Sequence, residues 1–595
     1  MKKIPVTGVY FHYYTNGHAE SINFLETENY IKKIPGVIIL GNSNELPPID
    51  KQLFIKKIQE LHIERLVIAG YSPGMVKTFF TSAMLEAGQD AEKVLIAGFN
   101  EYGAIKKSDT ELAKIILHFT IAGLSLDDIS TYSKKPVNEN TLVIGGGIAG
   151  IQASIEIANS KHKVYLLEQT GTIGGHMAMF DKTFPTLDCA ACILTPKMVE
   201  VGQHPFIELM TYCEVIGVTG EHGDFKVKVL KKARRVDLAD CIGCGICSEK
   251  CPAKTPSEFD AGTTLRKAIY IPFPQAVPNK YLIDAEHCIY VENGKCGVCV
   301  KVCPADAVIL DQLDEEVEIN VGNIVLATGF STFDARRAEN FGYGKLPNVL
   351  TSLEFERLVN ASGPTEGNIT FRTIDKKGNP IFTNDSKSPQ SVALIHCIGS
   401  RDLTYNQYCS KVCCMYSLKL AHLVKEKLPD AEVYEYYIDM RAYGKGYEEF
   451  YERIKGEGVH IIRGRTAKIE QTNDKLLLRS EDIENNRLIE QLVDMAILSV
   501  GIEPRADSNS LAEMLEIVTD NYGWYIEENS ILNTTNTNRP GITLAGVCQG
   551  PKDIPDTVVH ASAAAAKVIQ NIILQKTKKA IDKVMLSEIE TTLKD

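Results

Sequence analysis

The fold of this chain can be inferred from one glycine-rich stretch, Thr141-Leu142-Val143-Ile144-Gly145-Gly146-Gly147-Ile148-Ala149-Gly150. Residues 141–144 predict a short apolar strand, and the helix-forming run 151–158 follows the glycines. Glycine at 145, 147 and 150 permits a tight turn, close approach of the backbone to a pyrophosphate, and packing of the helix on the strand. Together with Ala149, these residues predict a dinucleotide-binding turn.

The residues after this turn keep the register of a strand–helix–strand unit. A second strand over 163–167 leads to Glu168, eighteen residues after Gly150 (168 − 150), whose carboxylate can accept the ribose hydroxyls. A glycine fingerprint by itself also occurs by chance in structural turns. Because strand, helix, second strand and acid all agree here, the dinucleotide site is favoured over a bare turn.

Length and charge limit the possible functions. At roughly 150 residues per domain, 595 residues predict about four domains. The 64 Lys+Arg against 76 Asp+Glu give a net charge of −12 with no basic block, which argues against nucleic acid or an anionic membrane as a partner. No uninterrupted apolar run of membrane-spanning length and no signal-peptide core is visible, so we expect a cytoplasmic protein with no membrane span.

Sixteen cysteines are too many for disulfides in a reducing cytoplasm, so metal or redox chemistry is expected. None precedes Cys189. Eight lie within 241–303 and four within 397–414, and clusters of this kind are typical of ligand sets.

The eight form two rows typical of bacterial ferredoxins. The rows are Cys241-x2-Cys244-x2-Cys247-x3-Cys251-Pro252 and Cys288-x7-Cys296-x2-Cys299-x3-Cys303-Pro304. In this arrangement the fourth cysteine of each row crosses to the other cluster. The rows therefore predict one [4Fe–4S] cluster at Cys241, Cys244, Cys247 and Cys303, and another at Cys288, Cys296, Cys299 and Cys251. A zinc ribbon would instead separate its pairs by roughly 15–20 residues.

The rest of the dinucleotide region is discontinuous. A closing strand over 323–326 leads to Gly329, a second one over 496–500 leads to Gly501, and Gly546 precedes a C-terminal helix over 558–574. Two α/β halves of this kind resemble the plan of the thioredoxin-reductase and glutathione-reductase flavoproteins. That resemblance implies FAD in the first half.

A third cysteine group lies where the second half should carry a glycine fingerprint. The predicted strand 392–396 is followed by Cys397-Ile398-Gly399-Ser400-Arg401, which lacks it, so we expect the nicotinamide site to be lost. Cys397, Cys409, Cys413 and Cys414 match the count for one more [4Fe–4S] cluster. The alternative is structural cysteines in a core helix, but two adjacent residues cannot both face one helix stripe. Lys419 on the same helix is either a cation that stabilises a reduced flavin or a solvated lysine.

The pair Cys189-Ala190-Ala191-Cys192 leaves three alternatives open. It is a redox-active dithiol, half of a metal site, or two small residues at the start of a helix.

These features predict an α/β fold with five segments. They are an N-terminal α/β domain over 1–135, the first part of an FAD-binding Rossmann half over 141–235, an inserted two-cluster ferredoxin domain (α+β) over 236–312, the remainder of the thioredoxin-reductase-like region with a further [4Fe–4S] site over 313–574, and a tail over 575–595.

Nearly the whole chain is similar to the A subunit of heterodisulfide reductase. The similarity rests on 145–150 with Glu168, on Gly174-Gly175, on 187–198, on the ferredoxin rows and third cysteine group, on 439–446, and on 549–557, which contains Asp553 and Ile554. The resemblance implies FAD held at these glycines, at Asp553 and at Ile554, in a soluble complex whose flavin splits electron pairs. It further implies disulfide-reducing B and C subunits, a hydrogenase or formate dehydrogenase-type donor, ferredoxin and a second copy of the chain as partners.

Two departures from that family are visible. The stretches 11–14 and 71–74 carry no cysteine, so no cluster is expected in the N-terminal domain, and the tail 575–595 contains no second ferredoxin domain. Either a partner subunit supplies the electron-transfer branch that a second ferredoxin domain would provide, or this version of the complex uses one branch fewer. The rival interpretation, a stand-alone NAD(P)H-dependent iron–sulfur flavin reductase, requires a second glycine fingerprint near 397. A scaffold with vestigial cofactors is disfavoured by the complete cysteine rows.

Overall fold

The computed structural model describes residues 5–12, 22–70, 73–129, 136–374 and 380–574. The described chain forms two units, one before residue 130 and one from residue 136 to 574. Several predictions fall outside the described residues: those on Tyr13, Tyr14, Tyr71, Ser72 and the tail 575–595.

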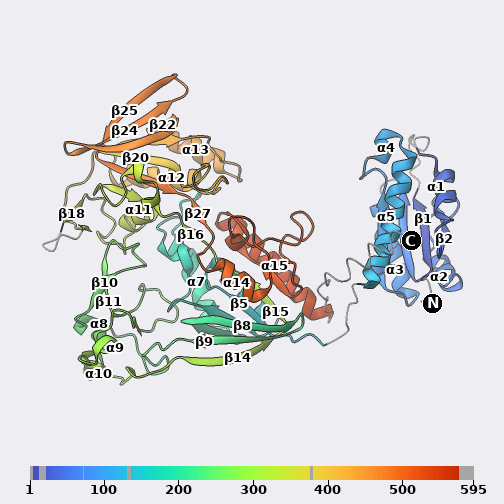
Figure 1. The fold of residues 1–595 in the computed structure, drawn as a ribbon, viewed down its shortest axis with the longest axis horizontal. Coiled ribbons are helices and arrows are strands. Elements are labelled where there is room, and N and C mark those ends of the chain that lie inside the picture. Colours follow the sequence, from blue (N-terminus) through green and yellow to red (C-terminus); the bar gives the residue numbers. More distant parts are fainter. Residues whose placement is uncertain (1–4, 13–21, 71–72, 130–135, 375–379, 575–595) are drawn as a thin grey trace. The chain divides into compact units, whose positions relative to one another are not determined.

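The first unit is a parallel sheet with helices on both faces (Figure 1). Its strand order is β2-β1-β3-β4, with β1 Thr7–His12, β2 Val37–Asn42, β3 Arg65–Gly70 and β4 Val94–Gly98. Its helices are α1 Phe24–Ile31, α2 Lys51–Glu60, α3 Lys77–Glu86, α4 Ala104–Lys107 and α5 Thr110–Ile129. Alternation along β1 sends Val9 and Phe11 into the core under α1 and α5 and Tyr10 into the core under α2 and α3.

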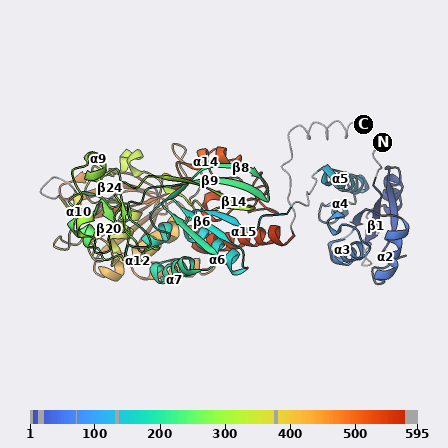
Figure 2. The same cartoon turned by 90° about the horizontal axis from the view of Figure 1, so that it is seen from below.

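The first half of the second unit is a five-stranded parallel sheet assembled from distant segments. Its order is β28-β15-β5-β6-β7, with β5 Thr141–Ile144, β6 Val164–Glu168, β7 Ile207–Thr211, β15 Asn323–Leu326 and β28 Ile542–Leu544. Helices α6 Ile148–Asn159 and α15 Ile554–Leu574 lie side by side on one face, with α7 Ala190–Gln203 next to them (Figure 2). The other face packs on α14 Ser508–Leu515 and on an antiparallel sheet of β8 Cys213–Glu221, β9 Asp224–Lys231 and β14 Glu315–Val321.

The second half repeats this plan (Figure 1). Its parallel sheet has the order β17-β26-β20-β21-β22, with β17 Val349–Thr351, β20 Ser391–Ile398, β21 Glu432–Tyr437, β22 His460–Arg463 and β26 Met495–Val500. An antiparallel sheet of β23 Thr466–Thr472, β24 Lys475–Asp482 and β25 Arg487–Val493 accompanies it, with helices α11 Ser352–Val359, α12 Cys413–Lys427 and α13 Tyr447–Gly456. Two short ribbons complete it, β16 Ser331–Thr332 with β27 Ile502–Glu503 and β18 Arg372–Ile374 with β19 Pro380–Phe382.

The cysteine-rich segment is inserted at the end of a β-ladder. Because β9 and β14 pair antiparallel with Lys231 opposite Glu315, residues 232–314 leave and re-enter the first half at one point. The insert holds only short elements: α8 Ile246–Lys250, β10 Lys254–Pro256, β11 Leu265–Lys267, β12 Ile269–Tyr270, β13 Leu282–Ile283, α9 Ile289–Asn293 and α10 Val298–Val302.

The insert is nevertheless part of the first half's core. Phe273 and Ala276 pack in the same apolar cluster as α6, α7 and α15. The buried Arg234 guanidinium donates to the carbonyl oxygens of Gly171, Lys280 and Tyr281, and so ties the insert to the sheet. Deleting the insert would therefore open the dinucleotide domain, and its clusters are better tested by point substitution.

Within the described residues, one helix, α15 over Ile554–Leu574, meets a length-and-hydropathy test for a membrane span. The helix carries five residues of the core cluster that also contains α6: Ala561, Ala564, Ala565, Val568 and Ile572. A core helix of this kind passes the same test, so α15 is weak evidence for a membrane span.

Candidate functional site

The glycine turn after β5 has the backbone geometry that the sequence predicts. Gly145 has φ +108°, and a Cβ there would lie 2.3 Å from the carbonyl oxygen of Ala327. A Cβ on Gly150 would lie 1.8 Å from the carbonyl oxygen of Gly145. These two positions hold the loop, the helix and β15 close together, and a side chain at either would separate them.

Gly147 plays a different part. It is the N-cap of α6 with extended backbone (φ −75°, ψ −178°), and a Cβ built on it would meet no protein atom within 4 Å. Gly174 donates its N–H to the carbonyl oxygen of Gly146 (2.8 Å), and Gly175 lies against the Cα of Gly147. The free face at the helix N-terminus is thus a cradle that side chains would fill, and it fits the pyrophosphate of FAD.

Glu168 at the end of β6 braces this loop. One carboxylate oxygen accepts the N–H of Gly146 and the other accepts that of Thr170, both at 2.8 Å. Each oxygen keeps a second lone pair, so the predicted ribose contact stays available.

The remaining predicted cofactor residues come from β15 and from the turn before α15. Gly329 (φ +75°) lies two residues after Ala327, and a Cβ there would also meet nothing within 4 Å. A Cβ on Gly546 would lie 2.7 Å from the Cβ of Ala149. Asp553 is buried, caps α15 by accepting the N–H of Asp556 (2.8 Å), and accepts the hydroxyl of Tyr447. Ile554, which follows Asp553, is the first residue of α15.

The ferredoxin cysteines line two separate cavities. One cavity is lined by Cys241, Cys244, Cys247 and Cys303 with Pro304. The other is lined by Cys251, Cys288, Cys296 and Cys299 with Pro252. Each cavity thus combines three cysteines of one row with the last cysteine of the other row, the crossing expected for two cubanes.

The insert is organised around thiols rather than around a single ion. Among the described residues, no group of three or more His, Cys, Asp or Glu side chains has the geometry to hold one metal ion. A [4Fe–4S] cubane keeps its four thiolates farther apart than a single ion does, so eight cysteines facing two cavities fit clusters better than zinc.

The third group places three of its four thiols together. Cys397 is the second-last residue of β20, Cys413 and Cys414 begin α12, and all three are buried. Hydrogen bonds from Cys413 hold the pKa of Cys397 and Cys414 below the usual thiol range, and His396 contributes at Cys414. Cys409 is half-buried, and the guanidinium of Arg401 interacts electrostatically with both Cys409 and Cys397.

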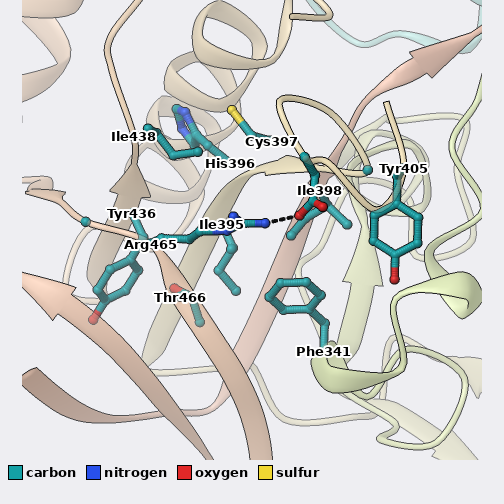
Figure 3. A pocket seen from close by; sticks show the side chains of 13 residues that line it. Phe341, Ile395, His396, Cys397, Ile398, Tyr405, Tyr436, Ile438, Arg465 and Thr466 are labelled. Atoms are coloured by element: carbon teal, nitrogen blue, oxygen red, sulfur yellow. Dashed lines mark hydrogen bonds and ion pairs between the residues drawn. The ribbon is translucent and has the colours of Figure 1, made fainter. Parts of the chain in front are cut away.

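A cavity beside Cys397 lies where β20 and β21 end (Figure 3). Apolar side chains such as Phe341, Ile398 and Tyr405 line it, and the ion pair of Arg465 with Asp402 crosses it. A Cβ on Gly399 would lie 2.2 Å from the Phe333 ring, so the only glycine of this loop faces a core aromatic ring. The loop after β20 thus lacks an open glycine cradle.

Lys419 is neither solvated nor a solitary cation, which corrects the alternative of a solvated lysine. Its Nζ lies 2.6 and 2.7 Å from the carboxylate oxygens of Glu356 and 3.1 Å from the carbonyl oxygen of Lys182. Both side chains are buried. The pair joins α12 and α11 to the loop after Gly175. That Lys419 acts on the flavin stays a prediction.

Removing the lysine is expected to destabilise the protein. Lys419→Met leaves the Glu356 carboxylate buried without its cation, which costs about 3–5 kcal/mol. The midpoint of thermal unfolding should fall accordingly, and Lys419→Met/Glu356→Gln should recover part of the loss because no unpaired charge remains. An unchanged midpoint for the single variant would contradict the buried pair.

Comparison with known proteins identifies the family of this chain. The model of an NAD(P)-binding Rossmann-like domain matches residues 143–200, and that of a 4Fe-4S binding domain matches residues 234–256. The A subunit of the H(2):CoB-CoM heterodisulfide,ferredoxin reductase of Methanothermobacter marburgensis is 42% identical over 572 residues, 95% of this chain and 84% of that protein. The chain belongs to the family of heterodisulfide reductase A subunits.

Two other relatives extend the comparison. The iron-sulfur A subunit of the CoB--CoM heterodisulfide reductase of Methanocaldococcus jannaschii is 41% identical over 91% of this chain and 81% of that protein. The A subunit of the Ferredoxin:CoB-CoM heterodisulfide reductase of Methanosarcina mazei is 37% identical over 87% of this chain and 64% of that protein. Among solved structures, Lactococcus lactis thioredoxin reductase covers 73% of this chain and 99% of its own length at 15% identity and a TM-score of 0.40.

The predicted family, the predicted fold class and the prediction of an oxidoreductase are confirmed. A dinucleotide-binding domain and a [4Fe–4S] ferredoxin domain are present. The number of clusters, the third cluster, the site residues and the partners stay predictions.

Sequence reasoning missed the side chains that join the two halves. Glu356 and the fully buried Arg357 stand side by side on α11, and Arg357 donates to Asp260 in the insert and to the carbonyl oxygen of Met179. The signal is visible afterwards in Ser352–Val359, where charged residues occupy a helix that is buried almost throughout. Their partners are distant in sequence, so no local pattern could identify them.

Proposed function

We propose that this chain is the FAD- and [4Fe–4S]-containing electron-transfer subunit of a heterodisulfide reductase-type complex in the cytoplasm. In that complex it splits or combines electron pairs between a donor of the hydrogenase or formate dehydrogenase type, ferredoxin, and disulfide-reducing B and C subunits. A second copy of the chain completes the assembly. The proposal extends the family membership to the chemistry that the cysteines and glycines of this chain support.

One observation carries the proposal: each cavity of the insert is lined by four cysteines, three from one row and one from the other. Two cubanes held in this way stand within a single small domain, which is the arrangement of a one-electron relay. The insert also shares a core cluster with the helices around the glycine turn, so relay and flavin site belong to one packed body.

When bound, FAD supplies two-electron chemistry that can be divided into single electrons, and each cubane carries one electron. The chain's residues set the conditions for this. Gly147, Gly174 and Gly175 leave room for the pyrophosphate, Glu168 is available to the ribose, and the cysteine rows offer thiolates.

The third cysteine group supports a relay in place of a nicotinamide site. In the second half the strand end that should carry the glycine turn carries Cys397 instead, and α12 begins with Cys413 and Cys414. We infer that these residues and Cys409 hold a third cubane. The alternative, a stand-alone NAD(P)H-dependent reductase, would need an open phosphate cradle where Arg465 and Asp402 pair.

The crossed ligation is testable with two double variants. Cys241→Ala/Cys303→Ala removes two ligands of one cavity, and Cys251→Ala/Cys288→Ala removes two of the other. Each should lose roughly four irons per chain, the content of one cubane, and keep its flavin. Iron, sulfide and flavin analysis of anaerobically purified protein gives the readout.

The same variants distinguish the crossed arrangement of ligands from an uncrossed one. If each row held its own cluster, each double variant would damage both clusters, and the loss would approach roughly eight irons. Cys213→Ala removes a buried thiol outside the cysteine groups and serves as the control that should lose none.

A further inference from the structure

The pair Cys189 and Cys192 is joined by a disulfide, with Cα atoms 5.3 Å apart. Both residues are exposed, whereas Cys213 and Cys548, the thiols outside the cysteine groups, are buried. The bond stands at the N-terminus of α7, a helix of 14 residues. Of the three alternatives that the sequence leaves open, the structure shows the two thiols close enough to bond to each other and open to solvent.

The two sulfurs are not equivalent. Cys189 is the N-cap of α7, and its Sγ accepts the N–H of Cys192 at 3.2 Å. A thiolate at this place is stabilised by that hydrogen bond and by the positive end of the helix dipole. Cys189 is therefore the better leaving group of the pair when the disulfide opens.

The loop that carries Cys189 is fixed by its backbone and its apolar side chains. Ala190 donates its N–H to the carbonyl oxygen of Asp181 (3.0 Å), and Thr183 donates to that of Asp188 (2.8 Å). Leu187, at φ +61°, packs with Phe184 on the core of the second half. The scaffold therefore holds the cysteines in place whether or not they are bonded.

The disulfide itself contributes little to the stability of the fold. It spans only three sequence positions, so it restricts the unfolded chain less than a bond between distant residues. Helix α7 is already held by Leu194, Met198 and Val201, which are all buried in the core. A disulfide that links residues close in sequence, is exposed and is not needed for packing is suited to thiol–disulfide exchange.

The same loop is connected to α12. The carbonyl oxygen of Lys182 accepts from the buried Lys419, and the Lys182 side chain pairs with Glu426 at 2.7 Å. The third cysteine group lies at the beginning of that helix, so the disulfide and the proposed third cluster share one rigid support.

We propose that Cys189 and Cys192 form a redox-active disulfide that exchanges with a dithiol of the thioredoxin class. A donor thiolate attacks Sγ of Cys192, and Cys189 leaves as the thiolate. The second thiolate of the donor then attacks its own sulfur in the mixed disulfide and releases Cys192. Two electrons and two protons pass from the dithiol to the pair, and the donor ends as a disulfide.

The test uses the full chain, purified anaerobically with its cofactors, and dithiothreitol as the dithiol. Protein equilibrated with reduced and oxidised dithiothreitol at set ratios is quenched with acid, alkylated and digested with trypsin. The peptide Thr183–Lys197 contains only these two cysteines, so its mass reports them separately from all cluster ligands. The labels on this peptide should rise from zero to two as the ratio rises and return to zero on reoxidation.

Single variants test the assigned roles. At neutral pH, Cys189 in Cys192→Ser should be alkylated roughly tenfold faster than Cys192 in Cys189→Ser, because only Cys189 receives the amide hydrogen bond. The buried Cys548 in the same native sample should stay unlabelled and serves as the internal control.

Four results would overturn the proposal. The pair could stay a dithiol at every ratio, it could stay locked as a disulfide at every ratio, or the two single variants could react at equal rates. Loss of iron from Cys189→Ser/Cys192→Ser would also overturn it, because the pair would then be a metal ligand.

Discussion

The Gly147→Val variant is expected to fold and to purify without FAD. Gly147 has extended backbone that valine adopts freely, and its Cβ would meet no protein atom within 4 Å. The branched side chain would instead occupy the face at the N-terminus of α6 that the pyrophosphate must approach. Steric overlap costs about 1–3 kcal/mol even in an adaptable core, and each step of about 1.4 kcal/mol weakens Kd tenfold.

The readout is flavin absorbance per chain, with circular dichroism to show that the variant is folded. Gly456→Val is a matched control, because a Cβ on Gly456 also meets nothing within 4 Å and this glycine lies at the end of α13, outside the glycine turn. The control should retain its flavin. Stoichiometric FAD in the Gly147→Val protein would contradict the assignment of this turn as the FAD site.

Cys413→Ala/Cys414→Ala is expected to lose roughly four irons per chain, the content of one cubane, and to keep both ferredoxin clusters. The two residues are buried at the start of α12, where alanine fits without a large cavity and continues the helix. The flavin should remain bound, but reduction of the flavin by a low-potential donor should slow sharply because the relay is interrupted.

Cys548→Ala provides the comparison for this variant, because Cys548 is equally buried and belongs to no cysteine group. Its iron content should equal that of the unmodified protein. Full iron content in Cys413→Ala/Cys414→Ala would show that these thiols are core residues and not ligands.

The parts of the fold that sequence could predict are those with local signatures. The turn at 145–150 needs glycine at fixed offsets because Gly145 and Gly150 touch backbone atoms, and this requirement is visible without any structure. The cysteine rows likewise fix their spacing within a few residues. The strands β5, β6 and β15 accordingly form within one residue of the predicted ranges 141–144, 163–167 and 323–326.

What sequence could not predict depends on contacts between distant segments. The sequence leaves Lys419 as either a cation beside the flavin or a solvated lysine, and its buried pair with Glu356, 63 positions away, becomes visible only in the structure. The cysteine rows predict an inserted domain, but they give no sign that Phe273 of the insert packs in the core of the first half. The pairing of Cys189 with Cys192 is local, but its exposure depends on how the loop from Asp181 is held by the second half.

We propose that the cysteine group of the second half replaces a nicotinamide site as the redox partner of the flavin. Its most direct test is anaerobic titration of the purified chain with NADH, NADPH and a low-potential one-electron donor, followed by flavin absorbance. We expect that neither nicotinamide bleaches the flavin and that the low-potential donor does so through the clusters. Rapid bleaching by NADH or NADPH would contradict it.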